Sequence, residues 1–170
     1  MMESLTIGQA QKLTSPNPFA LISTITKDGK NNLMALSWWT YLSNHPAMIG
    51  VCLSKRGYSG ELIAASGEFC LCVPEKSLRE AALSCGKCSG REHEKAAEFG
   101  IALTEAEHVS PMRVRDSRLV LECKLVRQVK AADHNFYIAE VVGAYGDPEA
   151  AGLYAMEGYR SLNTVSETAE

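Results

Sequence analysis

The segment Ser54-Lys55-Arg56-Gly57-Tyr58-Ser59 gathers two cations and three hydroxyls within six residues. It follows an apolar, strand-like run and precedes the sequence GELIAAS (60–66), whose composition favours a short helix with Ser59 as its N-cap. A guanidinium, an ammonium and the free amides of a helix N-terminus are groups that bind a phosphate dianion. The segment therefore predicts a phosphate site, and a solvated basic turn without a ligand is the alternative.

Both tryptophans of the chain, Trp38 and Trp39, lie in the segment Asn31 to Thr40 beside several short amides and hydroxyls. Adjacent residues on a strand face opposite sides, so we expect at most one indole to enter the core. The other is then available for an interface between protein copies or for contact with an aromatic ligand.

The six cysteines include one C-x-x-C motif, Cys85-Gly86-Lys87-Cys88. No second pair of ligands with zinc-finger spacing accompanies it, so we expect no metal site. Lys87 favours a thiolate, whereas the expected position at the C-terminus of a helix opposes one, which leaves a redox dithiol and a structural role both open. The other four cysteines lie in apolar runs and are expected to be buried, reduced thiols.

The elements that position these residues are mostly strands. Apolar and β-branched runs predict strands over residues 19–26, 33–40, 47–53, 68–73, 119–129 and 136–144. The Asp28-Gly29 pair predicts a tight hairpin turn after the first strand, and residues 130–135 are expected to form another hairpin connection.

Three short helices are expected between the strands. The first covers residues 60–66 and ends at Gly67, and the second covers 78–84 with Ser77 and Glu80 as a capping box. The third covers 92–99 and is closed by Gly100. A strand-rich chain without alternating strands and helices favours a mainly β fold, an antiparallel β-barrel with a few short inserted α-helices.

Length and composition are typical of a single globular domain. The chain has 170 residues, 46% hydrophobic and 22% charged, with 17 basic and 20 acidic side chains. This length supports a hydrophobic core in one domain, and no apolar stretch reaches the ~18 residues of a membrane span. The basic residues are dispersed along the sequence, so the sequence does not predict a basic surface that binds nucleic acid. Because residues 1–11 carry Glu3 and no basic flank or long apolar block, we expect no export signal and a cytoplasmic protein.

The chain divides into three expected parts. Residues 1–12 form an N-terminal arm, residues 13–148 form the barrel domain, and residues 149–170 form a C-terminal segment whose last half-dozen polar residues are expected to fray.

The order and spacing of these motifs resemble the flavin reductase-like family of FMN-binding split barrels, which includes flavoredoxin. The matching segments are Pro16 to Thr26, Asp28-Gly29-Lys30, Asn32-Leu33-Met34, Ser37 to Thr40, Ser43 with Pro46, Lys55 to Ser59 before Glu61-Leu62-Ile63, Glu68 to Pro74, Cys85-Gly86, Ser89-Gly90-Arg91 with Lys95, Leu119 to Leu125, and Asp133-His134 before Phe136 to Val142. Family members usually carry a basic residue immediately before the loop tyrosine, where this chain has Gly57. The sequence thus leaves open whether Lys55 or Arg56 meets the phosphate.

The resemblance implies a split β-barrel that binds FMN at the interface of a homodimer. The implied cofactor-binding residues are Asn32, Leu33, Met34, Ser37, Trp38, Trp39, Thr40, Ser43, Ser54, Lys55, Arg56, Tyr58, Ser59, Ser89, Gly90 and Arg91. His134 matches a position that approaches the flavin or nicotinamide in some relatives, so it is the candidate catalytic residue. An exposed hairpin histidine is the alternative.

The implied function is that of an FMN-dependent oxidoreductase. It is either an NAD(P)H:flavin reductase or a flavoredoxin-like electron carrier that works with a redox protein, because FMN itself accepts hydride and releases electrons singly or in pairs. A flavin-binding module for storage or redox sensing, without turnover, is the second hypothesis. A flavin-free barrel that serves only in assembly is the third.

Overall fold

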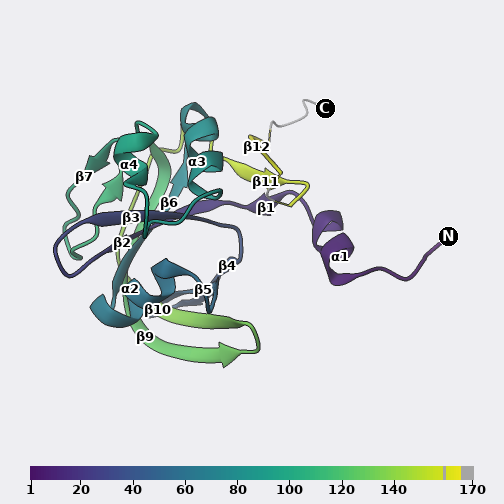
Figure 1. Cartoon of the computed structure of the whole chain (residues 1–170), viewed down its shortest axis with the longest axis horizontal. Coiled ribbons are helices and arrows are strands. Elements are labelled where there is room, and N and C mark those ends of the chain that lie inside the picture. Colours follow the sequence, from purple (N-terminus) through teal and green to yellow (C-terminus); the bar gives the residue numbers. More distant parts are fainter. Residues whose placement is uncertain (159, 166–170) are drawn as a thin grey trace.

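The computed structural model describes residues 1–158 and 160–165, and its centre is a seven-stranded antiparallel sheet (Figure 1). The hydrogen-bonded order of its strands is β3-β2-β6-β9-β10-β5-β4. These strands are β2 (Ala20–Ile25), β3 (Asn31–Leu36), β4 (Trp39–Asn44), β5 (Ala47–Ser54), β6 (Glu68–Pro74), β9 (Ser117–Ala131) and β10 (His134–Gly146). The expected mainly β, antiparallel fold is confirmed. Part of the C-terminal end expected to fray, residues 166–170, lies outside the described residues.

The connection between β3 and β4 closes the sheet into a split barrel. The two strands form opposite edges of the sheet, yet only Ser37 and Trp38 separate them in the sequence. The two edges must therefore approach each other at this point, where the Cys52 amide donates to the Trp38 carbonyl at 2.8 Å. The expectation of one continuous strand over 33–40 was wrong, because the chain leaves one edge of the barrel and joins the other within this segment.

Two hairpins agree with the sequence patterns. Thr26 and Lys30 close the turn between β2 and β3 through an N–H···O bond of 2.9 Å, with Gly29 at a φ of 84°. The long hairpin of β9 and β10 turns at Ala132 and Asp133, and Ala132 adopts a φ of 46°. Both turns use the left-handed conformation that tight hairpins require.

Helix α2 (Tyr58–Ser66) begins earlier than expected. Its N-cap is Gly57, which contributes no side-chain hydrogen bond, and Ser59 lies inside the first turn instead of capping it. Gly67 ends the helix at a φ of 72°, as its position predicts. The N-terminus of α2 consequently has no side-chain acceptor at its N-cap.

Helices α3 (Arg79–Cys85) and α4 (Lys95–Glu98) also differ from the sequence expectation. The capping box of Ser77 and Glu80 does not form, because a 3₁₀ turn, η1 (Lys76–Leu78), precedes α3 and the Ser77 hydroxyl donates to Glu75. Helix α4 has only four residues, where eight were expected.

The central strands β2 and β6 are buried on both faces, which explains why they are continuous apolar runs. Along β6, Phe69 and Leu71 enter one hydrophobic cluster, whereas Cys70 and Cys72 enter the other. The first cluster includes Ile49, Val51, Leu53 and Tyr137 inside the barrel, and the second lies beneath α3 and residues 99–114. All six cysteines are free thiols; Cys70, Cys72 and Cys123 are buried as expected, whereas Cys52 is only half-buried.

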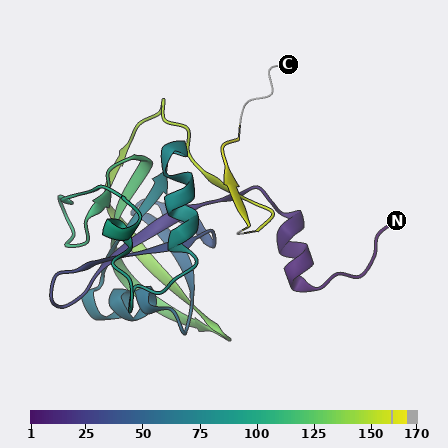
Figure 2. The same cartoon turned by 45° about the horizontal axis from the view of Figure 1, so that its top comes forward.

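The two terminal regions lie beside the barrel (Figures 1 and 2). Strand β1 (Asn17–Pro18) pairs with β11 (Tyr154–Met156), which pairs with β12 (Ser161–Asn163). Strands β7 (Leu103–Thr104) and β8 (Arg113–Val114) form a separate ribbon. Helix α1 (Ile7–Leu13) stands away from the body and buries none of its residues. Among the described residues, no helix combines the length and apolar character of a membrane span.

Candidate functional site

An apolar chamber of about 390 Å³ opens where β3, β5 and α3 meet. It is lined by Phe19, Met34, Ala35, Leu36, Trp38, Cys52, Leu53, Ser54, Ala82, Leu83, Gly86, Lys87, His134 and Leu162. Trp38 is 41% exposed and its ring lies 4.9 Å from the His134 ring, with their planes tilted by 35°. Trp39 instead is partly buried and packs against the barrel interior, in agreement with the expectation that at most one indole enters the core.

A polar chamber of about 320 Å³ adjoins the apolar chamber and shares Met34, Gly86 and Lys87 with it. Its remaining lining residues are Asn32, Arg56, Gly57, Tyr58, Ser59, Cys88, Ser89, Gly90 and Lys95. We call the two chambers together the cleft. One end of the cleft is thus aromatic and aliphatic, and the other presents cations and hydroxyls.

The two cations of the basic segment are placed differently. Arg56 lines the polar chamber and has no ion-pair partner among the residues that the structure describes. The Lys55 ammonium donates to the carbonyl of Ala132 in the β9–β10 hairpin, and Lys55 lines neither chamber. Arg56 is therefore the cation of this segment that faces the cleft.

Asn32 and Gly90 form a close-fitting floor beneath the polar chamber. Asn32 is 5% exposed, and its amide nitrogen donates to Thr24 at 3.1 Å and to Ser59 at 2.9 Å. Its Oδ1 has no partner, although buried polar atoms are nearly always paired. A Cβ at Gly90 would lie 1.7 Å from this oxygen, so only glycine fits here. An unpaired acceptor in a cationic chamber suits a ligand that carries hydroxyls as well as a phosphate.

Two lysines of the polar chamber were not among the predicted site residues. Lys87 lines both chambers, and Lys95 is 4% exposed with its ammonium donating to the Cys85 carbonyl at 2.7 Å. Burial lowers the pKa of Lys95, while the nearby Cys88 and Cys85 thiols act in the opposite direction. No local sequence pattern predicts that Lys95 is buried. The resemblance to the family was the only reason to note this residue in the sequence.

The cleft brings together ten of the seventeen predicted site residues. Those that line it are Asn32, Met34, Trp38, Ser54, Arg56, Tyr58, Ser59, Ser89, Gly90 and His134. Those that line neither chamber are Leu33, Ser37, Trp39, Thr40, Ser43, Lys55 and Arg91. Leu33 is fully buried in the core, while Trp39, Thr40 and Ser43 lie on the edge strand β4.

Arg91 lines neither chamber but lies over the ring of Tyr58, which lines the polar chamber. Its guanidinium forms an ion pair with Glu61 and lies 4.6 Å from the centre of the Tyr58 ring. The ion pair to Glu61 holds the guanidinium of Arg91 over the tyrosine ring. The structure thus gives Arg91 a positioning contact to a residue that lines the cleft.

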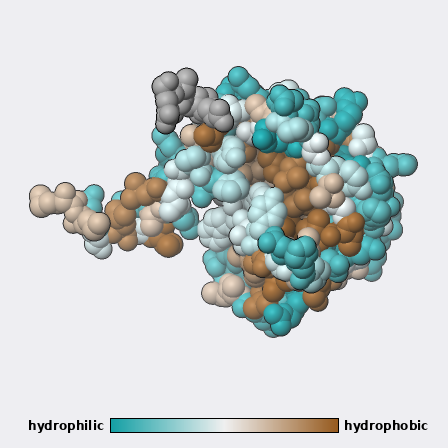
Figure 3. Space-filling view, turned by 180° about the vertical axis from the view of Figure 1, so that it is seen from behind, coloured by the Kyte–Doolittle hydropathy of each residue, from teal (hydrophilic) through white to brown (hydrophobic). Residues whose placement is uncertain are grey.

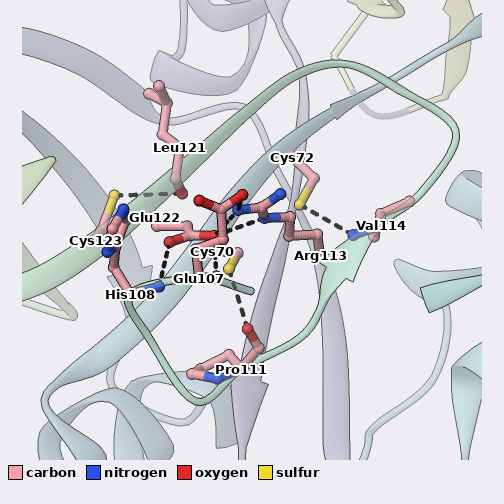
Figure 4. A network of polar contacts seen from close by, with 10 residues as sticks. All are labelled: Cys70, Cys72, Glu107, His108, Pro111, Arg113, Val114, Leu121, Glu122 and Cys123. Atoms are coloured by element: carbon pink, nitrogen blue, oxygen red, sulfur yellow. Dashed lines mark hydrogen bonds and ion pairs between the residues drawn. The ribbon is translucent and has the colours of Figure 1, made fainter. Parts of the chain in front are cut away.

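A second polar group, away from the cleft, surrounds the buried Glu122 (Figure 4). Its carboxylate accepts from the amides of Glu107 at 2.9 Å and His108 at 2.8 Å, and from the Arg113 guanidinium at 2.6 Å. Burial alone would raise the pKa of Glu122, but these hydrogen bonds outweigh it and the pKa is lowered. Because every donor is a protein group, this arrangement anchors the 105–114 loop to β9.

Comparison with known proteins decides the family. The family model described as "Flavin reductase like domain" matches residues 13–163. The chain belongs to the flavin reductase-like family. Membership supports a flavin-related redox function. The match runs through β11 and β12 as well as the barrel.

Individual relatives agree with this family. The structure of flavoredoxin from Desulfovibrio vulgaris (Miyazaki F) is 25% identical, with a TM-score of 0.86 over 100% of this chain and 96% of that one. An NADH:FAD oxidoreductase from Streptomyces globisporus, solved with NAD and FAD fragments, shares the fold at 17% identity and a TM-score of 0.85, covering 99% of this chain and 100% of that one. An uncharacterized protein of Archaeoglobus fulgidus is 26% identical over 141 residues, which are 83% of this chain and 78% of the relative.

Proposed function

We propose that this member of the flavin reductase-like family is an FMN-dependent oxidoreductase, acting as an NAD(P)H:flavin reductase or as a flavoredoxin-like electron carrier. The observation that carries the proposal is the join between the two chambers, an aromatic-lined cavity that continues into a cationic one at the start of α2. A flavin mononucleotide has the same division into a flat ring, a hydroxylated chain and a phosphate dianion.

The polar chamber would hold the phosphate. Arg56 supplies two N–H groups in a fixed fork, and the uncapped N-terminus of α2 adds amide donors and a favourable helix dipole. Lys87 and Ser89 line the same chamber. Asn32, whose buried Oδ1 has no partner in the protein, lines the same chamber.

The apolar chamber would hold the ring against Trp38 and Met34. FMN, when bound, accepts hydride from NAD(P)H and passes electrons on singly or in pairs. His134 lines this chamber and its Nδ1 lies 2.8 Å from Asp133 Oδ1, a hydrogen bond that lowers the pKa of Asp133. This contact and the neighbouring Trp38 ring hold the imidazole at the wall of the apolar chamber.

We further propose that the protein works as a homodimer in the cytoplasm. Figure 3 shows hydrophobic side chains gathered on one face of the body and along α1. Tyr41 and Leu42 on the edge strand β4 are 62% and 44% exposed, so this edge of the barrel offers apolar surface for a second copy. The six free thiols suit a reducing compartment.

Replacing Arg56 with alanine is expected to weaken FMN binding by about 10- to 100-fold, the usual loss when a charge-assisted phosphate contact is removed. Fluorescence quenching of FMN by the apo-protein measures this. Lys55→Ala is the matched control, because Lys55 faces the Ala132 carbonyl, and its FMN affinity should stay within a few-fold of the wild type. A larger loss from Lys55→Ala than from Arg56→Ala would contradict the assignment of Arg56 to the phosphate.

Replacing Trp38 with alanine is expected to weaken the binding of FMN and of riboflavin by the same factor of about fivefold, because aromatic stacking is worth roughly 1 kcal/mol and acts on the ring that both flavins share. Equilibrium titration of the two flavins gives the comparison. Trp39→Phe is the control, since Trp39 lines neither chamber. A loss confined to FMN would place the indole near the phosphate instead.

The oxidoreductase activity is tested by anaerobic titration of the FMN-loaded protein with NADH, NADPH and a reduced ferredoxin. Bleaching of the flavin absorbance by one of these donors is the expected result. A yellow protein that none of them bleaches would overturn the activity and favour a storage or sensing module. A protein that stays colourless with added FMN would overturn flavin binding as well.

A further inference from the structure

The C-x-x-C motif forms part of the wall between the two chambers. Helix α3 ends at Cys85, and Gly86 and Lys87, which line both chambers, lead directly to Cys88 in the polar chamber. A Cβ on Gly86 would lie 3.3 Å from the Ala35 Cβ, so this turn packs tightly on β3. Any change in the link between the two cysteines would therefore move residues of the cleft.

The backbone places the two cysteines on one turn, close to each other. The Lys87 amide donates to the Ser84 carbonyl at 3.0 Å, so the helical turn continues past Cys85. Residues three apart on such a turn have Cβ atoms about 5–6 Å apart, and a disulfide needs a separation of about 3.5–4.5 Å. The Cys88 thiol donates to the Ser84 carbonyl at 3.7 Å, and this weak contact has to break and the turn has to tighten by about 1–2 Å for the disulfide to form.

The two cysteines differ in access. Cys85 is 1% exposed, and burial raises its pKa to about 11 although the Lys95 ammonium acts in the other direction. Cys88 is half-buried and lines the polar chamber beside Lys95 and Lys87. Lys95 is a buried cation with no acidic partner among the described residues, and it interacts electrostatically with both thiols. Lys95 therefore places a positive charge in the cleft wall beside the cysteine pair.

We propose that Cys85 and Cys88 form a reversible disulfide that controls the shape of the polar chamber. The disulfide itself needs no flavin, whereas its effect on flavin affinity rests on the function proposed above. The feature that supports it is the placement of two neighbouring cysteines and a buried lysine in the cleft wall.

The reaction is an exchange with a low-molecular-weight disulfide, RSSR. The Cys88 thiolate attacks one sulfur of RSSR, which breaks the S–S bond, releases one RS⁻ and leaves a Cys88–SR mixed disulfide. Cys85 then loses its proton to a released RS⁻ and attacks the Cys88 sulfur, which releases the second RS⁻. The second RS⁻ takes the proton that Cys88 lost, so two protein thiols and RSSR become one protein disulfide and two RSH.

The test incubates the full-length apo-protein in glutathione buffers of increasing disulfide content, followed by alkylation and peptide mass mapping. We expect one intramolecular Cys85–Cys88 link that dithiothreitol reverses. Cys52→Ser, which removes a half-buried thiol elsewhere in the cleft, should keep the link, and Cys88→Ser should abolish it. Glutathione retained on Cys88 without a link to Cys85, or a link that persists in Cys88→Ser, would overturn the proposal.

A second measurement tests whether the Cys85–Cys88 disulfide changes FMN affinity, and it distinguishes this effect from the proposed function. FMN affinity of the wild type is compared in the oxidised and reduced forms, with Cys88→Ser under the same two conditions. We expect an affinity change of about tenfold in the wild type and none in Cys88→Ser. Equal affinity in both wild-type forms would overturn control of the chamber. If neither form binds FMN, the function proposed above is overturned. Peptide mass mapping would still show whether the disulfide forms.

Discussion

Glu122→Gln is expected to lower the free energy of unfolding by about 3 kcal/mol at neutral pH, because breaking a buried ion pair leaves uncompensated polar groups. The fully buried carboxylate accepts two backbone amides and a guanidinium. In the glutamine variant, the side-chain NH₂ group would face one of these N–H donors and leave it without an acceptor. Urea denaturation of both proteins measures the difference. Glu107→Gln is the matched control, since its side chain is 59% exposed and should lose little.

Acidification should reduce the difference between wild type and Glu122→Gln. The folded pKa of Glu122 is lowered from an unfolded value near 4.5, so its contribution is fully present above pH 4.5 and is lost as the pH falls through the folded pKa. The gap in unfolding free energy should thus be constant between pH 6 and 8 and shrink below about pH 4. A gap that grows on acidification would contradict the lowered pKa.

Gly90→Ala is expected to weaken FMN binding by about tenfold or more and to cost about 1–3 kcal/mol of stability, the usual effect of inserting a methyl group into a packed site. The new Cβ would overlap Asn32 Oδ1, and rotating Asn32 away would break its bonds to Thr24 and Ser59. The measurements are FMN titration and urea denaturation of the same variant.

Gly8→Ala is the matched control for Gly90→Ala. A Cβ at Gly8 meets nothing within 4 Å, and Gly8 lies within helix α1, where alanine is the better helix former. We expect unchanged FMN affinity and unchanged or slightly higher stability. Equal FMN affinity in Gly90→Ala and the wild type would show that Gly90 does not shape the binding site.

The strands were predictable because their signals are local, whereas the closure of the barrel is not. The apolar run 68–73 and the Asp28-Gly29 turn lie where hydrophobic pattern and turn chemistry place them. The break at Ser37 and Trp38 carries no such signal, because an apolar run reads the same whether it stays on one sheet edge or crosses to another. The predicted starts of helices α2 and α3 were also wrong. The N-cap at Gly57 and the 3₁₀ turn η1 before α3 depend on packing with the rest of the chain.

The candidate site was predictable as a set of segments but not residue by residue. The segment 54–59 was expected to carry a phosphate site, yet its sequence does not show that Lys55 turns to the Ala132 carbonyl and leaves Arg56 in the chamber. From the sequence, Lys87 was considered only for its effect on the thiols of the C-x-x-C motif. We did not predict that Lys87 lines both chambers. Side-chain direction at the end of a strand depends on neighbours distant in the sequence.

The most direct measurement is the ratio of FMN to riboflavin affinity for the wild-type apo-protein, determined by fluorescence titration in one buffer. The two ligands differ only by the phosphate. Because a cationic chamber continues from the aromatic one, the ratio should favour FMN by at least about tenfold and should fall toward one as salt screens the charges. Equal affinities at low salt would contradict the binding of a flavin phosphate beside Arg56 at the start of α2.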